Sequence, residues 1–203
     1  MPRTTTANHE IREARRAKLL DAARKVFVRQ GRAMTIADIA AEANVSQGLA
    51  YRYFTNKEAI FHALIEQVIE ASPAELHHFL QMQGTPGERL ALLVSQLFEG
   101  RRTYPEFFHL LDQGQIIETM PNDLRERVRD QGRALLELLR QLIVEAQQAG
   151  EVAQGDPDQL VIALTAYLEG MSWWILHNPE QFQQHAPSVE IALRLLKVPL
   201  EQK

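Results

Sequence analysis

The sequence predicts an all-α protein with an N-terminal three-helix helix-turn-helix domain, residues 1–57, and a larger C-terminal helical domain, residues 58–203. Three observations support this fold class. Apolar residues recur at three- and four-residue spacing along most of the chain. Capping residues and prolines stand where helices would begin, and glycine or asparagine where they would end. No segment alternates apolar and polar residues as a strand does.

The first helix is expected near residues 10–30, where Gly31 ends it. Its apolar positions fall on one face because they are separated by three or four residues. The residues expected to face inward are Leu19, Leu20, Ala23, Val26 and Phe27.

Residues 35–54 have the pattern of two short helices joined by a sharp turn. Thr35 stands three residues before Asp38, the spacing at which a hydroxyl caps a helix and the carboxylate faces its positive end. Asn44 tolerates the left-handed backbone that such a turn often needs, and Ser46 is expected to cap the second helix. The buried positions would be Ile36, Ile39, Ala40, Ala43, Ala50 and Phe54.

The C-terminal helices are predicted from their starts and ends. A capping box at 55–58 opens a long helix that would link the two domains, and Pro73 would kink or shorten it. A second capping box at Thr85–Glu88 opens a helix toward Arg102, and Pro105 and Pro121 open two more, the second of which runs to a turn at Gly150–Gly155. The next helix starts at Asp156-Pro157 and stops at Asn178-Pro179. A last helix runs from about Pro187 to Lys197.

The outer face of the second helix in 35–54 suits a nucleic acid. Gln47 and Arg52 can donate to base edges, whereas Lys57 and the hydroxyl side chains can reach phosphate oxygens. Gly48 removes a side chain where the backbone would approach the sugar-phosphate chain. The residues expected to bind DNA are Thr35, Ser46, Gln47, Gly48, Tyr51, Arg52, Tyr53 and Lys57. An ordinary helical hairpin with surface tyrosines is the alternative interpretation.

The chain resembles the TetR family of bacterial transcriptional regulators. The residues that carry the resemblance, in the first third of the chain, are Ala22-Ala23 and Phe27 before Gly31, then Thr35–Ala40, Val45–Gly48 and Tyr51–Glu58. It implies a three-helix DNA-binding head, an all-helical ligand-sensing body and a homodimer. It also implies phosphate anchors at Thr35, Tyr51, Tyr53 and Lys57, with Gln47, Gly48 and Arg52 nearest the bases. Three positions depart from the family pattern, which commonly has glycine at Asn44, leucine at Ala50 and histidine at Tyr53.

Charge is divided unevenly along the chain. Residues 1–58 hold 11 Lys and Arg against 6 Asp and Glu, whereas residues 59–203 hold 11 against 20. A basic head on an acidic body is expected when only one end approaches phosphate. Arginines 3, 12, 15 and 16 and Lys18 lie in or near an N-terminal arm that can touch DNA, although at least half of them are expected to be solvated surface.

The segment Asp156–His177 is apolar on more than one face, which favours an interface with a second copy. Together with Val189, Ile191, Ala192, Leu195 and Leu196 it would form a four-helix homodimer interface through the last two helices, as the resemblance implies. A helix buried within one subunit is the alternative.

A sensor pocket for a small-molecule effector would draw on the aromatic and methionine residues of the body, although each of these fits a plain core equally well. The ligand-binding candidates are Phe108, His109, Tyr167, Glu169, Met171, Trp174 and His177, with Phe107, Leu111, Ile116 and Trp173 beside them. Glu169 would select a cationic ligand or lie at a polar rim. No metal site is predicted, because paired His, Asp or Glu at ligand spacing is missing, and no cofactor is expected.

An enzyme is not expected, since the sequence has no glycine-rich phosphate loop, nucleophile elbow or convincing carboxylate pair. It has no cysteine, no signal peptide and no stretch that reads as a membrane span, so we expect a cytoplasmic protein without a membrane partner. The predicted function is a ligand-responsive transcriptional regulator, in its simplest form a repressor that binds a double-stranded palindromic operator as a dimer and is released by an effector. The alternatives are ligand-promoted DNA binding or activation, and a helical protein-interaction module without DNA binding.

Overall fold

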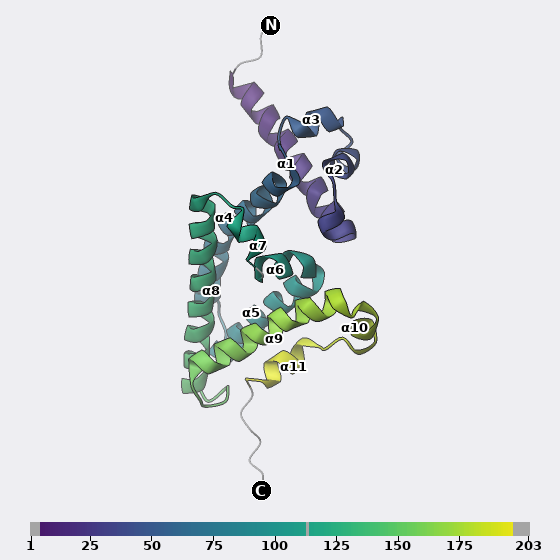
Figure 1. The fold of residues 1–203 in the computed structure, drawn as a ribbon. Helices are drawn as coiled ribbons and strands as arrows, with labels where there is room; N and C mark the ends of the chain where they lie inside the picture. The colour runs from purple at the N-terminus through teal and green to yellow at the C-terminus, as the bar shows by residue number, and fades with distance from the viewer. Residues whose placement is uncertain (1–4, 113, 197–203) are drawn as a thin grey trace. The chain divides into compact units, whose positions relative to one another are not determined.

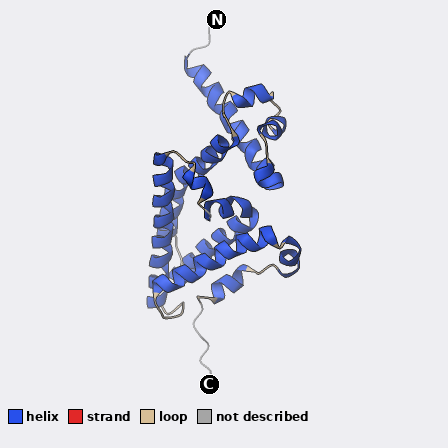
Figure 2. Ribbon diagram, viewed as in Figure 1, coloured by secondary structure: helices blue, strands red, loops and turns tan. Residues whose placement is uncertain are grey.

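The computed structural model describes residues 5–112 and 114–196, and these residues form helices and loops with no strand (Figures 1 and 2). The predicted all-α class is therefore confirmed. The chain divides into two compact units, Met1–Val68 and Ile69–Lys203. The first unit extends beyond residue 57 because Ile60, Phe61 and Leu64, on the next helix, are buried in it.

The first unit contains α1 (Thr5–Gln30), the 3-10 helix η1 (Gly31–Ala33), α2 (Ile36–Glu42), α3 (Gln47–Tyr51) and the start of α4 (Lys57–Gln81). Helix α1 ends where Gly31 takes a positive φ of 55°, as the glycine signal predicts. The rings of Phe27 and Phe61 meet edge to face at 5.3 Å between centroids, which joins α1 to α4 within this unit. All of the residues predicted to face inward from α1 are buried.

Helix α4 begins one residue later than its predicted cap implies. The side chain of Asn56 accepts a hydrogen bond from the backbone N–H of Ala59 at 2.8 Å, so Asn56 caps α4 in place of Thr55. Either residue type is a good cap, and the sequence alone did not distinguish adjacent candidates. The helix also continues past Pro73 to Gln81, so the predicted shortening at this proline is wrong.

The described residues of the second unit form the end of α4 and seven further helices: α5 (Pro86–Thr103), α6 (Pro105–Asp112), α7 (Gln115–Glu118), α8 (Asn122–Gln148), α9 (Pro157–His177), α10 (Pro179–His185) and α11 (Val189–Arg194). Helix α5 packs against α8 and α9, and α6 packs along α9 (Figure 1). The core between them is built from leucines and other aliphatic side chains, including Leu90, Val94, Leu139, Leu142, Ile143 and Leu164.

The predicted helix starts of this unit are largely confirmed. Thr85 and Glu88 form a reciprocal capping box with Pro86 in the first turn, and Asp156 caps α9 by accepting from the N–H of Asp158. Helix α8 starts after Pro121 and ends before Gly150, which has a φ of 72°. The starts of α5 and α9 depend on local hydrogen bonds, which is why the sequence identifies them.

Two short helices were not predicted. Helix α7 follows Gly114 at a φ of 70°, and α10 begins at Pro179, directly after the residue that ends α9. Asn178 is the boundary residue of both α9 and α10, so the predicted stop is also a new start. The last helix is shorter than expected, and Lys197 lies outside the described residues.

Helix α9 corrects the expectation that no segment is long and apolar enough to span a membrane. It has 21 residues and an 18-residue window with a mean hydropathy of 1.2. A core helix passes the same test, and α9 buries Val161, Leu164, Leu168 and Met171 in the second unit. Its composition therefore reflects one buried face and one exposed apolar face.

Candidate DNA-binding surface and ligand groove

Helix α2 is fixed at its start by Thr35 and Asp38. The Thr35 hydroxyl accepts from the Asp38 N–H at 3.2 Å, and the Asp38 carboxylate accepts from the Thr35 N–H at 2.9 Å. The Thr35 hydroxyl also donates to the same carboxylate at 2.6 Å. These bonds hold the pKa of Asp38 below its ordinary value, because they stabilise the charged form. The predicted cap at this position is confirmed.

The turn between α2 and α3 is a Schellman motif with Asn44 in the left-handed position. Asn44 has a φ of 52° and is the only non-glycine residue with a positive φ in the described chain. Its N–H donates to the Ala41 carbonyl at 3.0 Å, and the N–H of Val45 donates to the Ala40 carbonyl at 2.9 Å. These two bonds satisfy carbonyls at the end of α2, so the turn direction is set by the backbone.

Helix α3 is short and is seated by its apolar side. Ser46 caps it by accepting from the Leu49 N–H at 3.2 Å. Ala50 and Phe54 are buried, and the guanidinium of Arg16 on α1 lies 5.8 Å from the centre of the Phe54 ring. The helix ends at Tyr51, with Arg52 as its C-cap.

The other side of α3 is open to solvent. Gln47, Gly48 and Arg52 are exposed, and Tyr51 is 50% exposed. Tyr53 is only half-buried rather than freely outward, because it follows the end of α3 and lies beside buried Phe54. A Cβ placed on Gly48 would meet nothing within 4 Å, so the fold itself does not require glycine here.

Two of the predicted phosphate donors already bond within the first unit. The Lys57 ammonium donates to the Arg32 carbonyl at 3.2 Å, and Thr35 is bonded to Asp38 as described. Helix α2 is further tied to α1 by the ion pair of Arg29 and Glu42 at 2.7 Å. These bonds tie α2 to α1 and the start of α4 to the η1 segment within the first unit.

Basic side chains of the predicted N-terminal arm lie on α1. Arg12, Arg15 and Lys18 are exposed, whereas Arg16 lies 3.9 Å from the Glu66 carboxylate. Arg3 lies outside the described residues. The exposed cations supply charge that a phosphate backbone can use.

In the second unit, three of the predicted ligand residues border one groove. Tyr167, Met171 and Trp174 on α9 line a groove of about 470 Å³ that α10 and the following segment complete. The sequence did not predict the contributions of Gln181, Phe182, His185 and Pro187. The only signal for them is that Phe182 and His185 are three residues apart, which places both on one face of a short helix.

The other predicted ligand residues lie elsewhere. His177 stacks on Trp173 at 4.6 Å between centroids and meets the ring of His109 edge to face at 5.6 Å. Phe108 packs under Arg101, whose guanidinium lies 4.9 Å from the ring centre, and Glu169 is exposed. Among the described residues, no three His, Cys, Asp or Glu side chains are grouped to hold a metal ion. The predicted set is thus divided between separate surfaces.

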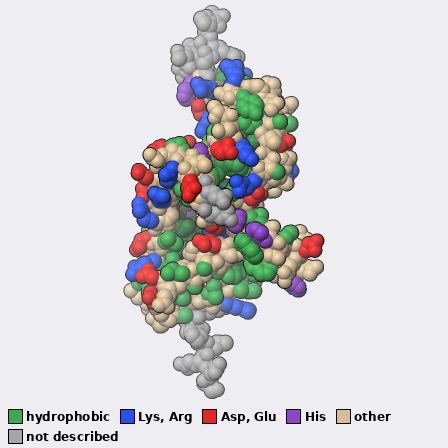
Figure 3. All heavy atoms as spheres, in the orientation of Figure 1, with side chains coloured by type: hydrophobic (Ala, Val, Ile, Leu, Met, Phe, Trp, Pro, Cys, Tyr) green, Lys and Arg blue, Asp and Glu red, His purple; other side chains and the backbone are tan. Residues whose placement is uncertain are grey.

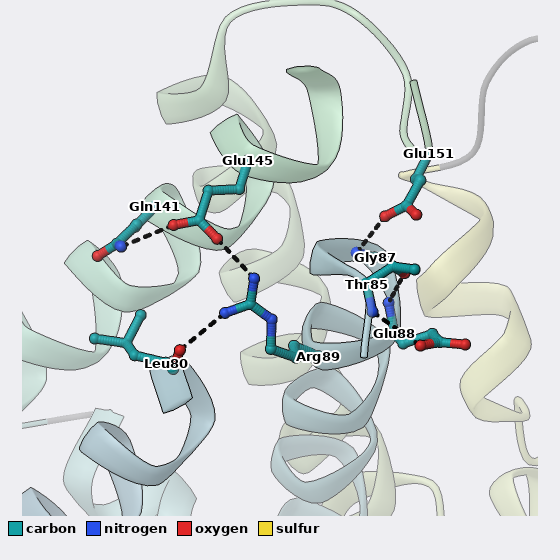
Figure 4. Close-up of polar contacts among 8 residues, drawn as sticks. All are labelled: Leu80, Thr85, Gly87, Glu88, Arg89, Gln141, Glu145 and Glu151. Carbon is teal, nitrogen blue, oxygen red and sulfur yellow. Dashed lines mark hydrogen bonds and ion pairs between the residues drawn. The ribbon is translucent and has the colours of Figure 1, made fainter. Parts of the chain in front are cut away.

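Two arginines that the sequence did not single out connect helices of the second unit. Arg101 on α5 pairs with Asp112 on α6 at 2.7 Å and lies 3.5 Å from the buried hydroxyl of Ser172 on α9. Arg89 donates to the Leu80 carbonyl at 3.0 Å and to the Glu145 carboxylate at 2.9 Å (Figure 4). Arg89 therefore joins the end of α4 to α5 and α8.

The same two units are distinguished in comparisons with known proteins. Residues 19–64 match the model of bacterial regulatory proteins of the tetR family, and residues 83–178 match the tetracyclin repressor-like C-terminal domain. Together the two matches cover more than half of the chain. The chain belongs to the TetR family.

Among curated TetR relatives, the HTH-type transcriptional regulator BetI of Brucella canis is 32% identical over 90 residues, or 44% of this chain and 46% of BetI. The matched region spans a little under half the length of the curated relatives in this group. The solved MbdR regulator of Azoarcus sp. CIB is 22% identical with a TM-score of 0.66, covering 91% of this chain and 98% of that one. FadR of Bacillus subtilis, solved with stearoyl-CoA, is 21% identical with a TM-score of 0.58, covering 88% and 94%. These two structures show that the TetR fold is shared.

The local structure accounts for two of the three departures from the TetR pattern. Asn44 keeps the left-handed turn for which glycine is common. Ala50 is fully buried against its neighbours, so the smaller side chain still seats α3. Tyr53 is half-buried and supplies a hydroxyl donor where the family commonly has the ring N–H of histidine.

Proposed function

We propose that this chain is a ligand-responsive transcriptional regulator that binds a palindromic operator as a dimer, acts as a repressor, and is released by a small-molecule effector. One observation carries the proposal. Helix α3 is capped, seated on α2 and turned so that Gln47, Tyr51 and Arg52 are exposed together on its open side. An exposed polar and aromatic helix face of this kind fits the major groove. Because its partner is DNA, we also propose that the protein works in the cytoplasm.

The direct test is an electrophoretic mobility shift with the full-length protein and a palindromic fragment from beside its own gene. We expect a retarded complex at low salt that weakens as salt rises, because bound phosphates release counterions. A folded, dimeric protein that retards no such fragment at low salt would overturn the proposal and favour a protein-interaction module.

Side-chain roles divide into phosphate anchors and base readers. We propose that Tyr51 and Tyr53, with Ser46, Thr35 and Lys57, contact phosphates, whereas Gln47, Gly48 and Arg52 lie nearest the bases. Thr35 and Lys57 must then exchange or share their present bonds to Asp38 and Arg32 when DNA binds. Thr35 and Lys57 are both exposed, and both are already hydrogen-bonded.

These roles are separable by substitution. Tyr51→Ala should weaken binding to operator and random DNA by a similar factor, whereas Arg52→Ala should weaken operator binding by about tenfold or more and relax base preference. Arg129→Ala, an exposed arginine on α8, is the matched control and should change neither. Equal losses on both kinds of DNA from both head substitutions would contradict the separate roles.

The dimer is proposed to form on the exposed face of α9 together with α11. Ile162 on α9 is 67% exposed, and Ile191 on α11 and Leu195 directly after this helix are each nearly half exposed. In the view of Figure 3, hydrophobic side chains gather along α9. Two of the five residues predicted to contact the second copy, Ala192 on α11 and Leu196 after it, are instead buried within the subunit core, and Val189 is partly buried against that core. The proposed interface therefore rests on the outward residues alone.

A charge on this face should prevent association. Ile162→Glu is expected to give a folded monomer by analytical ultracentrifugation and to lose high-affinity operator binding, since two half-sites are no longer held together. Leu92→Glu, at an exposed leucine of α5, is the control and should remain dimeric. A dimeric Ile162→Glu variant would move the interface elsewhere.

Release by effector is proposed as a population shift. The dimer is expected to exist in two arrangements, one of which fits the operator less well. A ligand that binds this second arrangement more tightly shifts the equilibrium toward it, by an amount set by the difference between its affinities for the two arrangements. A tenfold change in operator affinity requires about 1.4 kcal/mol of coupling. Titrating small molecules into the preformed complex tests the sign, because a ligand that strengthens the complex indicates ligand-promoted binding instead.

A further inference from the structure

The groove between α9 and α10 has the size of a small-molecule site. Its volume of about 470 Å³ falls within the range of roughly 300–1,000 Å³ that such sites occupy. The wall on α9 is formed by Tyr167, Met171 and Trp174, and the opposite wall by Phe182 and His185 of α10. Both helices belong to the second unit.

The lining favours a flat, uncharged molecule. Three of the lining side chains are aromatic, and Met171 adds a polarizable thioether that is almost fully buried. Among the described residues that line the groove there is no lysine, arginine or carboxylate, and His185 is their one ionisable side chain besides Tyr167. A charged ligand would lose hydration here without a partner of opposite charge.

One polar group of the wall lacks a partner. The hydroxyl of Tyr167 is buried and makes no hydrogen bond with any described residue. Burial raises the pKa of Tyr167, so the hydroxyl is protonated at neutral pH and available as a donor. Buried polar groups are nearly always paired in folded proteins, so an unpaired hydroxyl on a residue that lines the groove indicates a missing acceptor.

The side of the groove on α9 is open because of a glycine. Gly170 lies one turn from Tyr167 and Trp174, and a Cβ built on it would meet nothing within 4 Å. Glycine is unfavourable inside a helix, and no neighbouring backbone or side chain requires it at this position. The space above Gly170 is therefore free for a ligand ring.

We propose that the α9–α10 groove binds an uncharged, largely aromatic small molecule that stacks on Trp174 and Phe182 and accepts a hydrogen bond from Tyr167 through a carbonyl or similar oxygen. The proposal deepens the proposed function by naming the chemistry of the effector, and in that respect rests on it. Binding itself is measured without DNA, so the two stand or fall on different experiments.

The test compares two neutral naphthalene probes of similar size in the full-length protein. PRODAN carries a ketone oxygen, and N-phenyl-1-naphthylamine has no carbonyl. Both should increase in fluorescence on binding and quench tryptophan emission, because Trp174 borders the groove. Tyr167→Phe should weaken PRODAN by about fivefold to tenfold, the loss of one hydrogen bond, and leave the other probe unchanged.

Thermal unfolding separates this role from a structural one. Because the Tyr167 hydroxyl is unpaired without ligand, Tyr167→Phe should melt at the same temperature as the parent or higher. A clearly lower melting temperature would mean that the hydroxyl stabilises the fold and would overturn its assignment to a ligand.

A filling substitution tests the location. Gly170→Leu should abolish binding of both probes while retaining the helical fold, since the added side chain enters open space. Gly132→Leu on α8, where a Cβ also meets nothing within 4 Å, is the matched control and should bind both probes normally. Normal probe binding by Gly170→Leu would overturn the proposal.

Two further outcomes are decisive. If probe affinity falls as protein concentration rises and the dimer forms, a second copy of the chain fills the groove and the ligand assignment is wrong. If Tyr167→Phe weakens both probes equally, the hydrogen bond is not made. A mobility shift that fails while the probes bind as expected refutes the regulatory function and leaves the ligand chemistry standing.

Discussion

The turn between α2 and α3 gives a sharp test of the physical reasoning, because Asn44 acts there through its backbone. The residue is exposed and has a φ of 52°, a region that most side chains avoid. Alanine in this region costs about 1–2 kcal/mol, whereas asparagine tolerates it better. Asn44→Ala should therefore destabilise the first unit by about 1 kcal/mol, although no packed side chain is removed. Asn44→Gly should stay within about 1 kcal/mol of the parent, since relief of strain is offset by greater freedom when unfolded.

The end of α8 supplies an internal control with the same geometry. There the Gly150 N–H donates to the Gln147 carbonyl and the Glu151 N–H donates to the Ala146 carbonyl, at 3.0 and 2.9 Å. Gly150 has a φ of 72°, and a Cβ on it would meet nothing within 4 Å. Gly150→Ala should thus show the same penalty of about 1–2 kcal/mol, and Gly150→Asn a smaller one.

Native-state hydrogen exchange is the suitable assay, because it resolves opening of each unit separately. Amide protection in α2 should fall in Asn44→Ala and remain in Gly150→Ala, with the reverse pattern in α8. Urea unfolding followed by circular dichroism gives the accompanying global change. Full protection in Asn44→Ala, alongside the expected loss of about 1–2 kcal/mol in Gly150→Ala, would refute the account of Asn44 as a left-handed cap.

Two other predictions concern single polar contacts. Thr35→Val should return the pKa of Asp38, followed by carboxyl NMR titration, toward its ordinary value, because the carboxylate loses the hydrogen bond that the Thr35 hydroxyl donates to it. Since the pKa of Asp38 is lower in the folded than in the unfolded protein, its stabilisation is present above about pH 4 and is lost as the pH falls through the folded pKa. An unchanged pKa in Thr35→Val would contradict the hydrogen bond from Thr35 as the cause of the shift. Arg89→Met and Glu145→Gln should each lower the free energy of unfolding in urea by about 2 kcal/mol, because each leaves the remaining member of the ion pair without its partner. The double variant should lose less than the sum, since the second substitution removes a group that is already unpaired. Additive losses would show that the pair is not coupled.

The head was predictable because its determinants are local. Thr35, Asn44 and Ser46 each act on backbone groups within four residues, so their spacing in the sequence already states the geometry. The internal bond of Lys57 was not predictable in the same way. Its partner carbonyl at Arg32 is 25 residues away, and only the fold brings the two together.

The body was predicted well in its long helices and poorly in its short ones. Long helices such as α8 and α9 have both an apolar period and strong terminal signals. Helix α10 has a single large apolar residue, Phe182, and therefore shows no period. The ligand groove depends on α10, so a sequence reading that missed this helix also missed one wall of the groove.

The division of the predicted ligand residues follows from helix geometry. Trp173 and Trp174 are adjacent, so they point about 100° apart on a helix of 3.6 residues per turn. Trp174 is seven residues after Tyr167, which is one step of three and one of four residues, so the two side chains share a helix face. Both border the groove. Trp173 shares the neighbouring face with His177, on which it stacks. An aromatic cluster that is contiguous in the sequence thus serves two surfaces, and only residues on the groove stripe remain candidates for contact with the proposed ligand.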